Sequence, residues 1–175
     1  MKTKFCTILN ALKSPINVGM IVRSHAAYGG SELIFTGQNL PWEFKKGTQA
    51  FSRKLEKQCN VMHIPNQFEA LEWCKENGYS SIAIEINENA IFLDEFLFPD
   101  CSAIIVGNEE HGLDSEFMEK CDHLVTIKQI GEVASLNVAV SASTAMYELN
   151  RCCTDVNKII GTEYQVRQVG NGGKP

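Results

Sequence analysis

Short apolar runs alternate with amphipathic stretches along most of the chain. Each apolar run is bounded by polar residues or glycine, which is typical of buried strands. The predicted strands cover residues 5–12, 32–37, 61–64, 81–86, 102–108 and 123–128. The intervening stretches carry apolar residues at helical spacing and predict helices. The predicted helices cover residues 17–29, 67–78, 114–121 and 135–152.

This alternation predicts the fold class. Strands that are continuously apolar, with a helix between most of them, favour an α/β fold with a mostly parallel sheet and helices on both faces. With 175 residues the chain can bury one full core. We expect residues 1–154 to form one domain, and the polar residues 155–175 to form a partly disordered tail.

Ligands of such sheets bind beyond the carboxyl ends of the strands. No glycine-rich dinucleotide or phosphate-binding loop follows any predicted strand, so a Rossmann site and a P-loop are unsupported. Three other loops at strand ends are rich in glycine and asparagine. They are residues 14–19 (SPINVG), 106–114 (VGNEEHGLD) and 127–137 (IKQIGEVASLN).

The last of these loops leads into the longest predicted helix. Ser135, Leu136 and Asn137 are expected to open that helix behind a flexible segment that contains Gly131. Ser and Asn are favoured at helix N-termini because their side chains accept free backbone N–H bonds. An open N-terminal turn also receives ligands. The local pattern permits both interpretations.

The other two loops carry candidate polar groups. Gly107 ends an apolar strand, where a glycine lets a ligand approach the backbone, and Gly112 is expected to take a positive φ. Glu109 between them is either a solvated surface acid or part of a site. Arg23 lies inside an apolar helix, where it either extends to solvent or presents its guanidinium to a phosphate. We expect no metal, because the acids and histidine of the second loop are too close together and have no further ligands.

Composition narrows the functional classes. The net charge of −5 argues against a protein covered in positive charge for nucleic acid. One local exception is the segment 43–57, whose basic residues are either a solvated helix face or an RNA contact; they include Lys45, Lys46, Arg53 and Lys54. No apolar run approaches the length of a membrane span. The seven cysteines form no C-x-x-C pair, so we expect free thiols in a reducing cytoplasm.

Three segments, in this order, resemble the three sequence motifs of the SpoU family of RNA 2′-O-ribose methyltransferases, in the SPOUT superfamily. The first resembles the pattern N-x-G-x-x-x-R through Asn17, Gly19 and Arg23. The second resembles G-N-E-G-x-G-L through Gly107, Asn108, Glu109, Gly112 and Leu113. The third resembles I-P-M-x-G-x-x-x-S-L-N-V through Ile127, Gly131, Ser135, Leu136, Asn137 and Val138.

The resemblance implies a fold and a cofactor. It implies that the C-terminal part of residues 1–154 forms a deep trefoil knot, and that S-adenosylmethionine binds there in a bent form, held largely by backbone groups. The residues that it places at the cofactor are Gly107, Ile127, Ser135 and Leu136, to which we add Glu85 at the end of a predicted strand. One departure is that Lys128 and Gln129 replace the Pro and Met of the third motif.

The resemblance also implies an activity, which is methylation of a ribose 2′-hydroxyl in tRNA or rRNA. We expect Arg23, Glu109, Asn137 and Asn17 to be catalytic. A guanidinium is a poor general base, so we expect Arg23 to hold the neighbouring phosphate and stabilise charge on the attacking oxygen. The alternative is a knotted RNA- or cofactor-binding module without catalysis. We also expect a homodimer, because the helices after Asn17 and after Asn137 are more apolar than one buried face requires.

Overall fold

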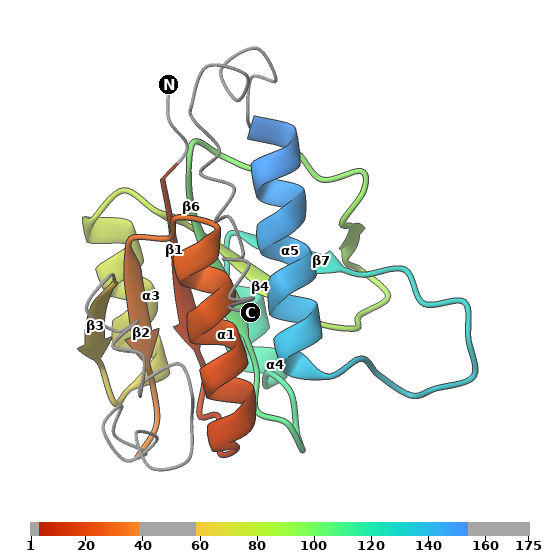
Figure 1. Ribbon diagram of the computed structural model, residues 1–175, viewed down its shortest axis with the longest axis horizontal. Coiled ribbons are helices and arrows are strands. Elements are labelled where there is room, and N and C mark those ends of the chain that lie inside the picture. The colour runs from red at the N-terminus through yellow and green to blue at the C-terminus, as the bar shows by residue number, and fades with distance from the viewer. Residues whose placement is uncertain (1–3, 39–58, 154–175) are drawn as a thin grey trace, which may run out of the picture.

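A computed structural model describes residues 4–38 and 59–153 of the chain. In this part of the chain it contains a seven-stranded sheet between two layers of helices (Figure 1). The strands are β1 (Lys4–Leu9), β2 (Glu32–Phe35), β3 (Asn60–His63), β4 (Ser80–Ile84), β5 (Ile91–Phe92), β6 (Cys101–Val106) and β7 (His123–Thr126). The helices are α1 (Pro15–Ala27), α3 (Gln67–Glu76), α4 (Ser115–Lys120) and α5 (Val138–Cys153).

The sheet has the strand order β3-β2-β1-β6-β4-β7-β5, and every pairing within it is parallel. The predicted α/β class and parallel sheet are therefore confirmed. One strand was missed: β5 has only two residues, too few for any apolar periodicity. Because the strands are parallel, all their carboxyl ends meet at one edge. That edge holds the three loops predicted to form a site.

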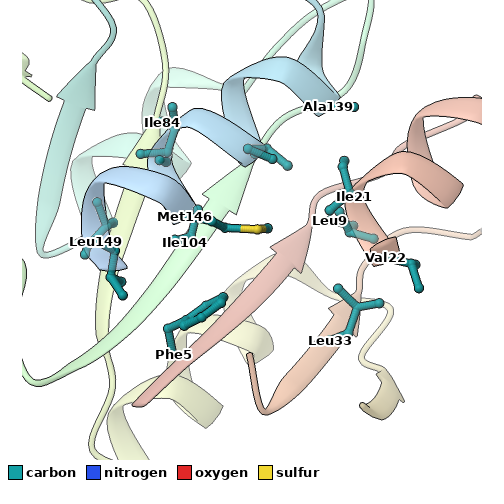
Figure 2. Packing of buried hydrophobic residues seen from close by; sticks show 14 of the residues in the cluster. Phe5, Leu9, Ile21, Val22, Leu33, Ile84, Ile104, Ala139, Met146 and Leu149 are labelled. Carbon is teal, nitrogen blue, oxygen red and sulfur yellow. The ribbon is translucent and has the colours of Figure 1, made fainter. Parts of the chain in front are cut away.

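Both faces of the sheet are covered, as predicted. Alternate residues of the strands point to opposite faces. One face packs against α1 and α5, where Figure 2 shows Ile21 and Met146 of the helices meeting Leu9 and Ile104 of the strands. The other face packs against α3 and α4, which contribute buried side chains such as Phe117. Helices on both sides leave the strand ends as the open part of the sheet.

Helices α1 and α5 lie side by side over the sheet (Figure 1). The buried residues of α5 include Ala139, Ala142 and Ala145, whose small side chains let the helix approach the sheet closely. Ser24 and Ser143 join the two helices through their hydroxyl groups at 2.7 Å. This packing fixes the starts of α1 and α5 relative to each other, and both starts contribute to the site.

The start of the last helix differs from the prediction. It begins at Val138 and not at Ser135. Asn137 is the cap, because its Oδ1 accepts hydrogen bonds from the backbone N–H groups of Ala139 (2.9 Å) and Val140 (3.4 Å). Ser135 and Leu136 precede the cap as loop residues and are free to serve as a pocket wall. Capping is therefore confirmed for Asn137 alone.

Several predictions fall outside the described residues. They are the four basic residues at 45, 46, 53 and 54 and the C-terminal tail. The trefoil knot stays a prediction. The cysteines whose side chains the structure describes are free thiols. None of the helices in residues 4–38 and 59–153 is long and apolar enough to cross a bilayer.

Candidate functional site

A pocket of about 500 Å³ opens at the carboxyl edge of the sheet. Its walls come from the ends of β4 and β6, the loop after β6, the start of α1 and the segment that leads into α5. Predicted site residues that line it are Asn17, Glu85, Gly107, Glu109, Ser135, Leu136 and Asn137. The sequence placed these residues at separate strand ends, and the parallel sheet brings them together.

A chain of hydrogen bonds joins the three loops. The Asn137 amide donates to Oδ1 of Asn17 at 3.0 Å. The Asn17 amide in turn donates to Oε1 of Glu109 at 3.0 Å. Asn17 is buried, whereas Glu109 and Asn137 are exposed on the pocket side. One side chain from each loop therefore takes part, and the amide of Asn17 is the link between the other two.

Glu109 also holds the turn before α1. Its carboxylate accepts the backbone N–H groups of Lys13 and Ser14, both at 2.9 Å. Partial burial raises the pKa of Glu109, but the hydrogen bonds from Lys13, Asn17 and Ser14 outweigh it and lower the pKa below its ordinary value. Glu109 is therefore an ionised acceptor with its donors in place at neutral pH. Such a group organises the loop and is poorly suited to take a proton.

The loop after β6 is closed tightly on itself. Backbone bonds join Asn108 and Gly112 in both directions, at 2.9 and 3.2 Å. A Cβ at Gly107 would lie 2.3 Å from the carbonyl carbon of Gly112. Gly112 has a φ of 66°, as predicted. The structure gives a further reason for glycine at position 107, since a side chain there would collide with the protein's own backbone, and ligand access at Gly107 stays a prediction.

Glu85 ties this loop to β4. Its Oε2 accepts the N–H of Leu113 at 2.9 Å, and its Oε1 accepts the N–H of Ile86 at 3.0 Å. Asn108 makes a second tie, because its amide donates to the carbonyl of Ala11 at 2.7 Å. The loop is thus anchored on both sides, and the pocket it lines has a defined shape before any ligand enters.

A smaller pocket of about 60 Å³ adjoins the larger one and shares several of its walls. Ile127, the remaining cofactor residue implied by the resemblance, lines this pocket together with Gln129. The neighbouring Lys128 donates to Asp94 at 2.9 Å and to Glu95 at 3.0 Å. Its Nζ also lies 4.5 Å from the centre of the Phe92 ring. The lysine that replaces a rigid proline is therefore held by three partners.

Arg23 does not join the site that residues 4–38 and 59–153 form. It lies exposed on α1, does not line either pocket, and makes no ion pair or hydrogen bond with the residues that the structure describes. Glu109 makes no contact with Arg23, because its carboxylate binds the turn before α1. The guanidinium is left available for a group outside the described residues.

Sequence reasoning missed some of the residues that shape the site. Lys13, before α1, bonds Glu110 of the loop after β6 at 2.8 Å, and the opposite charges of two loops at strand ends could have suggested this pair. His111 lines the larger pocket beside Glu110. Ser141, one turn into α5, lines both pockets, and its place on the helix face follows only from the observed cap at Asn137.

The two pockets differ in chemistry. The larger one presents amide and carboxylate groups, and the smaller one combines three isoleucines and one leucine with five polar residues. A ligand with an apolar, flat end and a polar, reacting end fits this pair of pockets. The backbone of the closed loop supplies further hydrogen-bonding groups.

Comparison with known proteins agrees with this geometry. Residues 4–147 match the model of the SpoU rRNA Methylase family. A protein of Staphylococcus aureus (strain COL), assigned to the TrmH family of tRNA/rRNA methyltransferases, is 31% identical over 153 residues. The match covers 87% of this chain and 60% of the relative, so the chain spans about 60% of the length of that relative.

Solved structures share the fold. The SpoU methyltransferase AviRb from Streptomyces viridochromogenes, solved in complex with AdoMet, superimposes with a TM-score of 0.75 at 24% identity. That match covers 93% of this chain and 60% of the other. A structure described as an RNA 2′-O ribose methyltransferase gives a TM-score of 0.72 at 26% identity, with 87% of this chain and 57% of the other covered.

The closed loop after β6 leads to a first prediction. Gly107→Ala should lower the free energy of unfolding by about 2 kcal/mol or more, because the new methyl group overlaps the Gly112 backbone. Gly131→Ala is the matched control, since a Cβ there meets nothing within 4 Å, and it should change stability by less than about 0.5 kcal/mol. Urea unfolding of both variants measures the difference. Equal stabilities would show that the loop opens at little cost.

Proposed function

The chain belongs to the SpoU rRNA methylase family, and on that premise we propose that it transfers a methyl group from S-adenosylmethionine to a ribose 2′-hydroxyl of tRNA or rRNA. The observation that carries the proposal is the hydrogen-bonded chain Asn137–Asn17–Glu109 in the wall of the larger pocket. It joins one residue from each family motif at one place. The relatives support it, since they include tRNA/rRNA methyltransferases and a ribose 2′-O-methyltransferase.

S-adenosylmethionine is the methyl donor, and its positively charged sulfur makes the methyl group open to attack. The residues present fit this cofactor. The smaller pocket offers apolar walls to a base, and Glu85 lies where the two pockets meet and has carboxylate lone pairs for hydroxyl groups. Gly107, Ile127, Ser135 and Leu136 complete the walls. The trefoil knot of the family is part of this proposal.

The reaction requires a ribose hydroxyl to be aligned with the methyl group. Positioning supplies much of the rate enhancement in such a transfer. Asn137 and Asn17 lie at the polar edge of the larger pocket, where they define the path of the incoming hydroxyl. Glu109 keeps the amide of Asn17 in a fixed orientation, because its own carboxylate is anchored by two backbone N–H groups. Glu109 is thus a positioning residue.

Arg23 acts on the RNA in this proposal. Its planar guanidinium binds the phosphate next to the target ribose through two parallel hydrogen bonds and stabilises charge on the attacking oxygen. Its exposure on α1 suits a group that meets a substrate and not the cofactor. The basic residues Lys45, Lys46, Arg53 and Lys54 extend the RNA contact along the phosphate backbone.

Methyl transfer to the ribose is the direct test of the function. The protein should move labelled methyl from S-adenosylmethionine to RNA extracted from cells that lack the gene. Digestion to nucleosides should place the label on the ribose, as a 2′-O-methylnucleoside. Label on a base would contradict the ribose assignment. Binding of cofactor and RNA without any transfer would favour the alternative, a binding module that has lost catalysis.

Arg23 gives the second prediction of this proposal. Arg23→Ala should reduce methyl transfer by at least about 100-fold, because a charge-stabilising group of the transition state is lost. Its cofactor affinity should stay within about threefold of the wild type, since Arg23 lies outside both pockets. Arg23→Lys should fail similarly, because an ammonium cannot reproduce the planar fork. Transfer at the wild-type rate by Arg23→Ala would remove Arg23 from the mechanism.

A homodimer completes the proposal. Part of the apolar surface on which the dimer was predicted is buried within the chain, including Ile21 and Val22. The outer sides of α1 and α5 still expose large apolar side chains. They are Ile16 (70%), Met20 (47%), Val140 (43%) and Tyr147 (54%). Two copies of this surface would meet across a two-fold axis and cover it. Arg23 lies on the same helix as Ile16 and Met20, and therefore next to this interface.

The oligomeric state gives the third prediction. At micromolar concentration the wild type should sediment at twice the chain mass of 19.5 kDa. Met20→Glu should shift it to the monomer, because it places an uncompensated charge in an apolar interface. Near-ultraviolet circular dichroism checks that the variant keeps its tertiary packing. A wild type that sediments as a monomer would overturn the dimer and leave the proposed reaction untouched.

A further inference from the structure

The methyl transfer proposed above releases a proton, because the ribose hydroxyl becomes an ether. A general base takes up such a proton, and it needs a free lone pair within reach of the hydroxyl. Among the residues that the structure describes, four titratable side chains line the larger pocket, namely Glu85, Glu109, Glu110 and His111. The contacts of these side chains show which of them is suited to accept the proton.

The three carboxylates are engaged by other groups. Glu109 accepts three N–H groups, and Glu85 accepts two. Oε2 of Glu110 accepts a hydrogen bond from Nζ of Lys13 at 2.8 Å, and this bond lowers the pKa of Glu110. A carboxylate stabilised by donors in its ionised form is a weak base. The imidazole of His111 is therefore the strongest candidate.

The imidazole of His111 is open to a substrate. The side chain is 81% exposed, and the described part of the chain forms no hydrogen bond with its ring. Its backbone is fixed, because its N–H donates to Oδ1 of Asn108 at 3.3 Å within the loop that Asn108 and Gly112 close. His111 lines the same pocket as Asn17 and Asn137, where the ribose hydroxyl is expected.

Glu110 determines which ring nitrogen is the acceptor. Its Oε2 lies 3.6 Å from Nε2 of His111. A negative charge beside Nε2 favours the tautomer that carries its proton there, so Nδ1 keeps a free lone pair. The same charge stabilises the imidazolium that forms when Nδ1 takes a proton, and Lys13 on the same carboxylate offsets part of this effect. The second family motif has glycine where this chain has Glu110, so the orienting carboxylate is a departure from the pattern.

We propose, on the basis of the reaction proposed above, that His111 is the general base of the methyl transfer. Nδ1 accepts the proton of the ribose 2′-hydroxyl while the oxygen forms a bond to the methyl carbon. The bond from that carbon to sulfur breaks, and its electron pair stays on sulfur, which leaves neutral S-adenosylhomocysteine. The imidazolium then passes its proton to water. Arg23 keeps its role at the phosphate, so one residue takes the proton and the other stabilises charge.

Single-turnover rates of methyl transfer test this role. The protein is mixed with S-adenosylmethionine and RNA from cells that lack the gene. The wild-type rate should rise with pH and then level off, since an imidazole loses its charge between about pH 5 and 8. His111→Gln should be at least about 100-fold slower at about pH 7, and its rate should keep rising because hydroxide takes the proton. Equal rates, or a profile that levels off in both proteins, would overturn the proposal.

Two charge variants assign the profile to His111. Glu110→Gln removes the anion beside the ring and should move the levelling-off to lower pH. Lys13→Gln removes the offsetting cation and should move it to higher pH, each by about half a pH unit at low salt. Proton NMR of the free protein should show the titration of the His111 ring moving in the same directions. A profile that does not follow the ring titration belongs to another group and contradicts the proposal.

Calorimetry with S-adenosylhomocysteine separates catalysis from cofactor binding. His111→Gln should bind this compound within about threefold of the wild-type affinity, because the imidazole acts on the RNA hydroxyl. A larger loss of affinity would make His111 a cofactor-binding residue and overturn its role as base. A wild type that transfers no methyl to ribose would refute the proposed function and this proposal together. Transfer by His111→Gln at the wild-type rate would refute only the role of His111.

Discussion

The site depends on a hydrogen-bonded chain that crosses large distances in sequence. Asn17 is separated from Glu109 by 92 residues and from Asn137 by 120 residues, yet its single amide bonds to both. This is possible only because β1 and β6 are neighbours in a parallel sheet and α1 packs beside α5. The sheet places the three loops at one edge, the packing of α1 beside α5 sets the distance between the starts of these helices, and Asn17 joins the loops through hydrogen bonds. The pocket is the space that these constraints leave.

Much of this arrangement could be predicted from the sequence. Continuously apolar strands with intervening helices predicted the parallel sheet, and parallel strands place their following loops at one edge. The three loops were therefore expected at one edge of the sheet, and the resemblance to the family motifs assigned Asn17 and Glu109 to one site. Local patterns do not encode which side chain bonds to which. The link from Asn17 to Glu109, the closure of the loop by Gly107 and the start of α5 at Val138 all depend on tertiary packing.

The two departures from the third family motif show again that local sequence patterns do not determine side-chain contacts. In the sequence, Lys128 and Gln129 only weaken a match to a pattern that has Pro and Met. In the structure, Lys128 replaces the rigidity of a proline ring with three side-chain contacts from the turn around β5. Strand β5 is too short to be predicted from apolar periodicity, so the contacts of its turn with Lys128 could not be predicted either. Gln129 lines the smaller pocket while its Oε1 is shielded from solvent, which its polarity alone would not have suggested.

The position of Arg23 shows what one chain leaves incomplete. The polar groups around the larger pocket are already engaged, since the carboxylate of Glu109 accepts three N–H groups and Asn17 bonds on both sides. None of them is a free cation that could balance charge on an attacking oxygen. Arg23 is such a cation, but it lies on the exposed side of α1 and lines neither pocket. In the proposed reaction the described part of one chain supplies the cofactor side, and the RNA meets α1 on the acceptor side. A second copy of the chain, packed on the exposed Ile16 and Met20 of the same helix, would lie beside the Arg23 that binds this RNA.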